Sequence, residues 1–93
     1  MSVSRNGGGP QNRIDEQMRT LARIAAAIAV GATAPTLAPL VEDGHASGVS
    51  DEEILGTLIA VAPIIGSVRV VRAAPELARA VGYDIDKAFE ESQ

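Results

Sequence analysis

Two long uncharged segments constrain the fold of this chain more than any other feature. Residues 24–41 carry no charged side chain over 18 positions, and residues 54–68 carry none over 15. So much apolar sequence has to be covered either by lipid or by other helices. The first segment is interrupted by Gly31, Pro35 and Pro39, and the second is shorter than the ~20 residues that a spanning helix needs. We therefore expect buried helices in a soluble oligomer, and a membrane hairpin is the less favoured alternative.

The composition determines how the core has to be built. The chain is 46% hydrophobic but only 2% aromatic, so its interior must consist of Ala, Val, Ile and Leu side chains. A domain of 93 residues buries only about 60–65% of the surface of its unfolded chain. Without cysteine there are no disulfides to add stability, and one histidine alone gives no zinc site. We expect no metal or cofactor, and we expect neighbouring copies of the chain to cover the remaining apolar surface.

The charge balance bears on possible partners, and the N-terminal sequence bears on localisation and domain bounds. The chain has 8 basic and 12 acidic residues, a net charge of -4, and no basic cluster. This balance argues against nucleic acid as a partner, because binding phosphates needs a concentrated positive surface. Residues 1–12 are polar and glycine-rich and lack the apolar segment of a signal peptide. We interpret them as a disordered tail on a cytoplasmic protein, followed by a single domain of residues 13–93.

Apolar spacing predicts helices throughout this domain. Residues 12–30 carry an apolar stripe at steps of four, three, four and three, which is typical of an amphipathic helix. No segment alternates apolar and polar residues as a half-buried strand would. Proline and glycine divide the rest of the chain, so that the predicted helices cover residues 12–30, 34–47, 51–62, 63–73, 75–82 and 85–91. The sequence therefore predicts an all-α bundle of about five to six helices, completed by oligomerisation.

The start of the third helix has the clearest local signature. Ser50 and Glu53 are placed for a capping box, directly after a helix-terminating Gly48. This segment, Gly-Val-Ser-Asp-Glu-Glu-Ile, followed by an alanine-rich helix and Gly66, resembles the carboxymuconolactone decarboxylase and alkylhydroperoxidase-D-like family. The resemblance covers about residues 18–71. It implies an alkylhydroperoxidase-D-like helical fold that assembles as homotrimers or homohexamers.

The groups that carry the family's chemistry are replaced in this chain. In a gap-free placement the Cys-x-x-Cys pair of the redox members falls at Thr33 and Thr36, and their histidine falls at Leu40. Thiol-based peroxide reduction is excluded, because a threonine hydroxyl cannot cycle through sulfenic acid or disulfide states. The resemblance then implies a non-redox protein without the usual catalytic groups, acting as an oligomeric assembly or a small-molecule-binding module. We place its ligand near Thr33, Thr36, Leu40 and Arg69.

The alternative is an enzyme, a decarboxylase or hydrolase of a small lactone. His45 is the single histidine, and Glu42 lies three residues before it on the same helical face. A carboxylate beside a histidine can orient it as a general base, and Arg69 would hold the carboxylate of the substrate. The simpler interpretation is a solvated helix end at His45, with Arg69 and Arg72 in ion pairs with Glu76 and the acidic residues near position 51.

Overall fold

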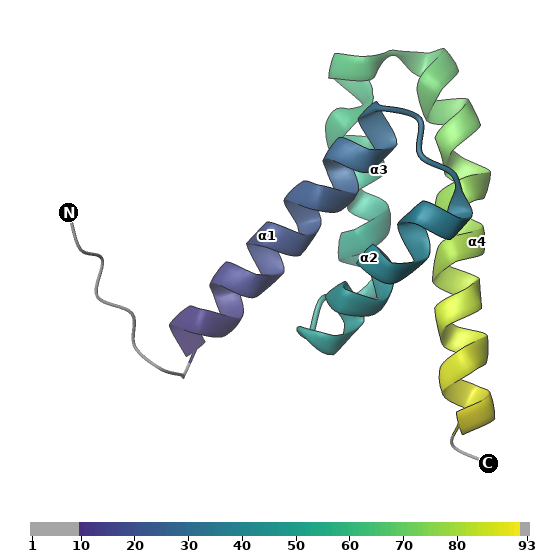
Figure 1. Cartoon of the computed structure of the whole chain (residues 1–93). Helices are drawn as coiled ribbons and strands as arrows, with labels where there is room; N and C mark the ends of the chain where they lie inside the picture. The colour runs from purple at the N-terminus through teal and green to yellow at the C-terminus, as the bar shows by residue number, and fades with distance from the viewer. Residues whose placement is uncertain (1–9, 92–93) are drawn as a thin grey trace.

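The structure, a computed structural model, describes residues 10–91, without the side chains of residues 10, 11, 83, 85–89 and 91. Over this range the chain is all-helical, with four helices and no strand, which confirms the predicted all-α class (Figure 1). The helices are α1 (Pro10–Ala29), α2 (Ala34–Ala46), α3 (Asp51–Ile65) and α4 (Ser67–Glu91). Residues 1–9 of the predicted tail lie outside the described residues.

The four helices form a thin slab. α2 packs mainly on α4 and α1, and α3 packs mainly on the same two helices (Figure 1). The molecule measures 42 × 42 × 19 Å, and its short dimension matches about two helices of ~10 Å diameter. Its radius of gyration is 14.4 Å, whereas a compact chain of this length has a value of about 12 Å. A single copy of the chain therefore has a large surface for its volume.

The core is small and aliphatic, as the composition predicted. It draws on all four helices and on the α2–α3 turn. Its buried apolar residues are Ile24, Ile28, Leu37, Val41, Val49, Ile54, Ala73, Leu77, Ala80 and Val81. The two uncharged segments are only partly covered by this packing, since Val30 is 80% exposed and Ile59 is 76% exposed. Much of the apolar sequence thus remains at the surface of one chain.

Neither uncharged segment forms one long helix. Residues 24–41 are divided between α1 and α2 by a turn at Gly31, and residues 54–68 are divided between α3 and α4 by a turn at Gly66. Both glycines have positive φ values, 81° and 90°, which other residues rarely adopt. None of the helices within residues 10–91 combines the length and the hydropathy that crossing a bilayer requires.

Residues 10–91 form four helices and not the predicted five to six, because Pro63, Pro75 and Gly82 do not end helices and a single break at Gly66 takes their place. α3 continues through Pro63 to Ile65, and α4 contains Pro75 in its interior, so the breaks predicted at these prolines are wrong. Both residues, and Pro39 inside α2, lie on exposed faces. A proline removes one helical hydrogen bond, but on an exposed face the carbonyl group that loses its partner is open to water. The helices therefore continue past all three prolines.

Local sequence sets the other helix ends. Gly31 and Gly48 follow α1 and α2 with φ values of 81° and 89°, as predicted. Ser50 Oγ accepts a hydrogen bond from Glu53 N at 3.1 Å, and Glu53 Oε1 accepts one from Ser50 N at 2.9 Å. The predicted capping box is therefore confirmed. Gly82, predicted to end a helix, lies inside α4, because buried residues just before it hold the helix against the core.

Candidate functional site

A groove of about 530 Å³ lies between the α1–α2 turn and the first half of α4. Its walls combine apolar and charged groups. They are formed by Ile28, Val30, Gly31, Ala32, Thr33, Arg69, Arg72, Ala73 and Glu76. The volume falls within the range of ~300–1,000 Å³ that is usual for small-molecule sites. This groove is the first candidate site.

The structure brings two of the four predicted ligand-binding residues to the groove. Thr33 lines it from the α1–α2 turn, and Arg69 lines it from α4. Thr36 is exposed one turn into α2, and Leu40 packs partly buried against the core. Neither of these two residues lines the groove. The binding surface is therefore made by the turn before α2 together with α4.

Glu76 links this part of α4 to the start of α2. Its Oε1 accepts a hydrogen bond from Ala34 N at 2.8 Å, and its Oε2 accepts one from Arg79. The hydrogen bond from Ala34 lowers the pKa of Glu76, partial burial opposes this, and Arg79 lowers the pKa further. Thr33 occupies the N-cap position of α2, but its side chain makes no capping hydrogen bond. Glu76 thus caps α2 from a different helix, an arrangement that no local sequence motif signals.

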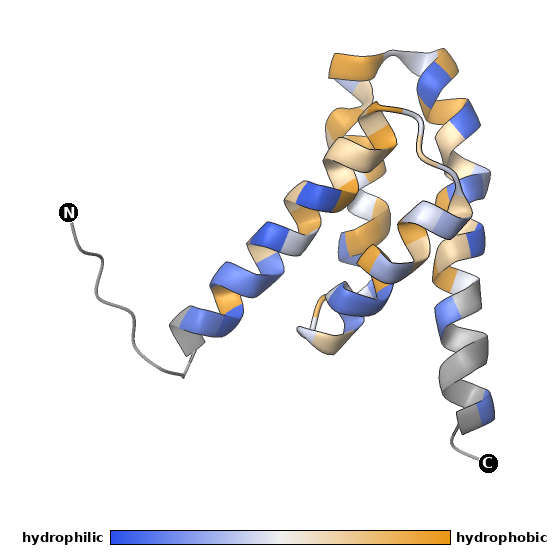
Figure 2. Ribbon diagram, in the orientation of Figure 1, coloured by the Kyte–Doolittle hydropathy of each residue, from blue (hydrophilic) through white to orange (hydrophobic). Residues whose placement is uncertain are grey.

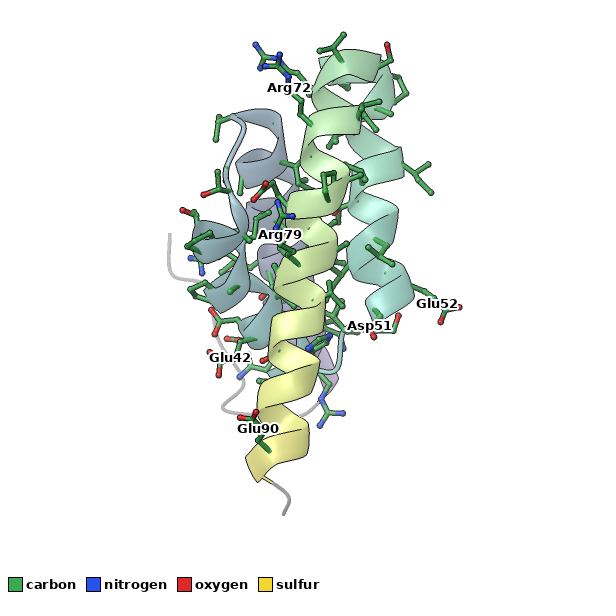
Figure 3. All side chains as sticks on the ribbon, turned by 90° about the vertical axis from the view of Figure 1, so that its right-hand side faces the viewer. Glu42, Asp51, Glu52, Arg72, Arg79 and Glu90 are labelled. Atoms are coloured by element: carbon green, nitrogen blue, oxygen red, sulfur yellow. The ribbon has the colours of Figure 1, made fainter. Side chains whose placement is uncertain are left out.

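The arginines of the groove do not form the predicted ion pairs. Arg69 Nη1 donates a hydrogen bond to Ala29 O at the end of α1, at 2.9 Å. Arg72 is exposed and has neither an ion pair nor a hydrogen bond among the described residues. Both carboxylate oxygens of Glu76 are used by other groups, and Asp51 lies far from Arg72 along the molecule (Figure 3). Guanidinium donors therefore remain available at the groove.

The second candidate site is centred on the single histidine. His45 lies in the last turn of α2, and its side chain is 24% exposed. Its Nε2 lies 2.5 Å from Oδ1 of Asp51, in the first turn of α3. Its Nδ1 is hydrogen-bonded to Oδ2 of Asp84 on α4. These three residues, termed the histidine clasp, connect three helices.

The two carboxylates that bond His45, those of Asp51 and Asp84, differ from the predicted partner, Glu42. Glu42, predicted to orient the ring, is exposed and lies on the opposite side of α4 from Asp51 in the view of Figure 3. Asp51 follows His45 by six residues, across the α2–α3 turn, so its proximity could have been anticipated. Asp84 is 39 residues away from His45 and lies within α4. Only the packing of α4 against α2 brings it to the ring.

The clasp favours the protonated form of its histidine. Partial burial acts to lower the pKa of His45, but hydrogen bonds to Asp84 and Asp51 and the charges of both carboxylates raise the pKa above its ordinary value of 6.5. An imidazolium can donate to both acids at once. A general base needs a nitrogen that is free to reach its substrate, and here each ring nitrogen faces a carboxylate oxygen. His45 also does not line the groove, so the clasp has the geometry of a structural link.

No known protein family, curated protein or solved structure matches this chain. Within the described range, no group of three His, Cys, Asp or Glu side chains is arranged to hold a metal ion. The groove, the histidine clasp and the exposed apolar side chains are the features of this chain that bear on its function.

Proposed function

We propose that this chain is a non-redox relative of the carboxymuconolactone decarboxylase-like family that self-associates and binds a small molecule in the groove. The Gly48–Ile54 motif supports the family assignment. The groove carries the binding function, because it combines an apolar wall with available arginine donors. Thr33, which stands where the redox members have their first cysteine in the gap-free placement, lines this groove. The proposed ligand site thus coincides with one end of the family's redox motif.

Self-association is supported by apolar side chains around the α3–α4 turn. Ile59, Ile64, Val68 and Val71 are 76%, 84%, 66% and 71% exposed, and together they are termed the apolar corner. Figure 2 shows apolar residues concentrated at this end of the molecule. Exposed aliphatic residues in such a group usually mark an interaction surface. Ile59, Ile64 and Val68 belong to the uncharged segment 54–68, and Val71 follows it in α4.

A second copy of the chain is the partner that fits this surface best. The part of the corner in residues 54–68 has no charged side chain that would select a partner of opposite charge, and Val71 lies between Arg69 and Arg72. In an interface between copies of this chain, around a three-fold or a two-fold axis, the apolar corner of one copy can pack close to the apolar corners of the others. The thin slab and the radius of gyration of 14.4 Å show that a single copy leaves much surface open to such packing.

Sedimentation velocity at micromolar concentration tests the assembly. We expect a mass several times the 9.6 kDa of one chain, corresponding to a homotrimer or homohexamer. Val71→Asp should reduce this mass towards that of a monomer while the helical circular dichroism is kept. Ala78→Asp, an exposed position two turns further along α4, adds the same charge and should leave the mass unchanged. A folded wild-type monomer would rule out self-association.

Titration with a small neutral amide, hexanamide, tests the binding function. We expect chemical-shift changes at the backbone amides of Gly31 and Ala32, because both residues line the groove. Ala32→Phe should fill the groove and weaken these changes. Ala22→Phe, at an exposed position on α1, provides the control for an added ring. If the two variants respond alike, the groove is not the binding site.

The alternative enzyme, a lactone decarboxylase or hydrolase using His45 and Glu42, has less support from the geometry. His45 would have to release one of its carboxylate partners before it could accept a proton. It would also have to reach a substrate outside the groove, which His45 does not line. Loss of lactone turnover in His45→Ala, with the fold retained, would nevertheless favour the enzyme over the binding module.

A further inference from the structure

We propose that the groove selects an amphipathic anion, a small carboxylate whose charged group lies against Arg72 and Arg69 and whose hydrocarbon part lies along the apolar wall. This inference rests on the proposed binding function and adds the chemical class of the ligand. It follows from three features of the groove: guanidinium donors that have no acidic partner, the lack of a free backbone N–H group in the first turn of α2, and apolar wall residues that remain exposed.

The charge balance at the groove is positive. Arg69 and Arg72 lie three residues apart on α4, which places them on the same helical face. Arg72 has no partner among the described residues, and Arg69 uses Nη1 for the carbonyl of Ala29. Glu76 is the one acidic residue among the groove-lining residues, and both of its oxygens are already bonded. A carboxylate ligand would supply the acceptor that these guanidinium groups lack.

The start of α2 offers no free backbone donor for an anion. Ala34 N donates to Glu76, and Pro35 has no N–H group. The next two amides, of Thr36 and Leu37, both donate to Thr33 O at 3.0 Å. Binding of an anion therefore depends on side-chain donors. The arginines supply the positive charge and the Thr33 hydroxyl is a neutral donor, so removing an arginine should have a clear effect.

The apolar wall determines what else the ligand must contain. Ile28, Val30, Ala32 and Ala73 form the apolar wall of the groove. Ile28 and Ala73 are only 1% and 5% exposed, so most of the hydrocarbon surface open to water belongs to Val30, which is 80% exposed, and to the partly buried Ala32. Covering this surface with a hydrocarbon chain is favourable, by about 25 cal/mol for each Å² removed from water. Inorganic phosphate would satisfy the arginines but would leave the wall exposed. The two parts of the groove together fit a molecule with one charged end and one apolar end.

Titration of the full chain with three probes, at constant ionic strength, tests this inference. The probes are hexanoate, hexanamide and inorganic phosphate, and binding is followed at the amides of Gly31 and Ala32. We expect hexanoate to bind at least about fivefold more tightly than either of the others. Arg72→Gln should abolish this preference, whereas Arg23→Gln, which removes the same charge from an exposed position on α1, should preserve it.

The possible results distinguish between the anion inference, the role of the apolar wall and the binding function. Equal binding of hexanoate and hexanamide, or equal behaviour of the two arginine variants, would overturn the anion inference and leave the binding function standing. Phosphate binding as tight as that of hexanoate would overturn the role of the apolar wall. If none of the probes binds, both the inference and the proposed binding function fail.

Discussion

The histidine clasp makes the stability of this protein depend on pH in a defined direction. Partial burial acts against protonation of His45, but Asp84 and Asp51 outweigh it and raise the pKa above 6.5 in the folded state. The unfolded chain keeps the ordinary pKa of about 6.5. Because the folded state binds the proton more tightly, the stabilisation is complete below the unfolded pKa. It is lost as the pH rises through the folded pKa.

The contribution of the clasp to the free energy of unfolding depends on how exposed its side chains are. A hydrogen bond that involves a charged group contributes roughly 1.5–3 kcal/mol where it is well buried. Asp84 is 16% exposed and His45 is 24% exposed, so their contact keeps most of this value. Asp51 is 45% exposed, so water and salt weaken its contact with the ring. At about pH 6 we expect His45→Gln to lower the free energy of unfolding by about 2 kcal/mol, mainly through loss of the Asp84 contact.

Two measurements check this prediction. Urea unfolding between about pH 6 and pH 9, at one fixed chain concentration, should show wild-type stability falling with pH and His45→Gln nearly independent of pH. His45 is the single histidine, so its ring proton in the NMR spectrum reports one titration without overlap. Asp84→Asn should lower the pKa read from that signal, and Asp51→Asn should lower it less. A pKa of His45 at or below 6.5, or a wild-type pH dependence in His45→Gln, would show that the clasp does not stabilise the protonated ring.

Three further substitutions test the helix ends and the packing around the α2–α3 turn by urea unfolding. Ser50→Ala removes the acceptor for the amide of Glu53 and should lower the free energy of unfolding by about 1 kcal/mol; an unchanged midpoint would contradict a role for the cap. Gly44→Ala should raise it by about 0.5–1 kcal/mol, because Gly44 is helical and an added Cβ would lie 3.4 Å from Thr20 Cγ2, an ordinary contact. Gly48→Ala should lower it by about 1–2 kcal/mol, because its φ is 89°. A shift of the same sign for both glycine variants would show that this reasoning is wrong.

The number of helices could not be predicted from local sequence. Local sequence predicts helix ends at Pro63 and Pro75, because the ring removes a hydrogen bond wherever it occurs. The cost of that lost bond depends on whether water can reach the carbonyl four residues earlier. Both prolines lie on exposed faces of their helices. Exposure is a property of the packed molecule, and so the sequence alone could not distinguish a helix end from an interior proline.

The candidate sites were also only partly predictable from the sequence. Thr33 and Arg69 were both predicted to bind ligand, and both line the groove. The sequence identifies His45 as a candidate because it is the single histidine, but helical spacing pairs it with Glu42. The carboxylates that bond the ring come from α3 and α4. Spacing along one helix gives no information on which residues another helix brings close.

By itself the sequence determined the all-α class, the helix ends at Gly31 and Gly48, and the capping box at Ser50. These features depend on hydrogen bonds and backbone conformations within a few residues, which the chain carries wherever it folds. Only the tertiary structure decided that Glu76 caps α2 from 42 residues away, and that Asp84 binds His45 from 39 residues away. Such pairs form because α4 packs against α2, and that packing depends on the shapes of whole helix faces.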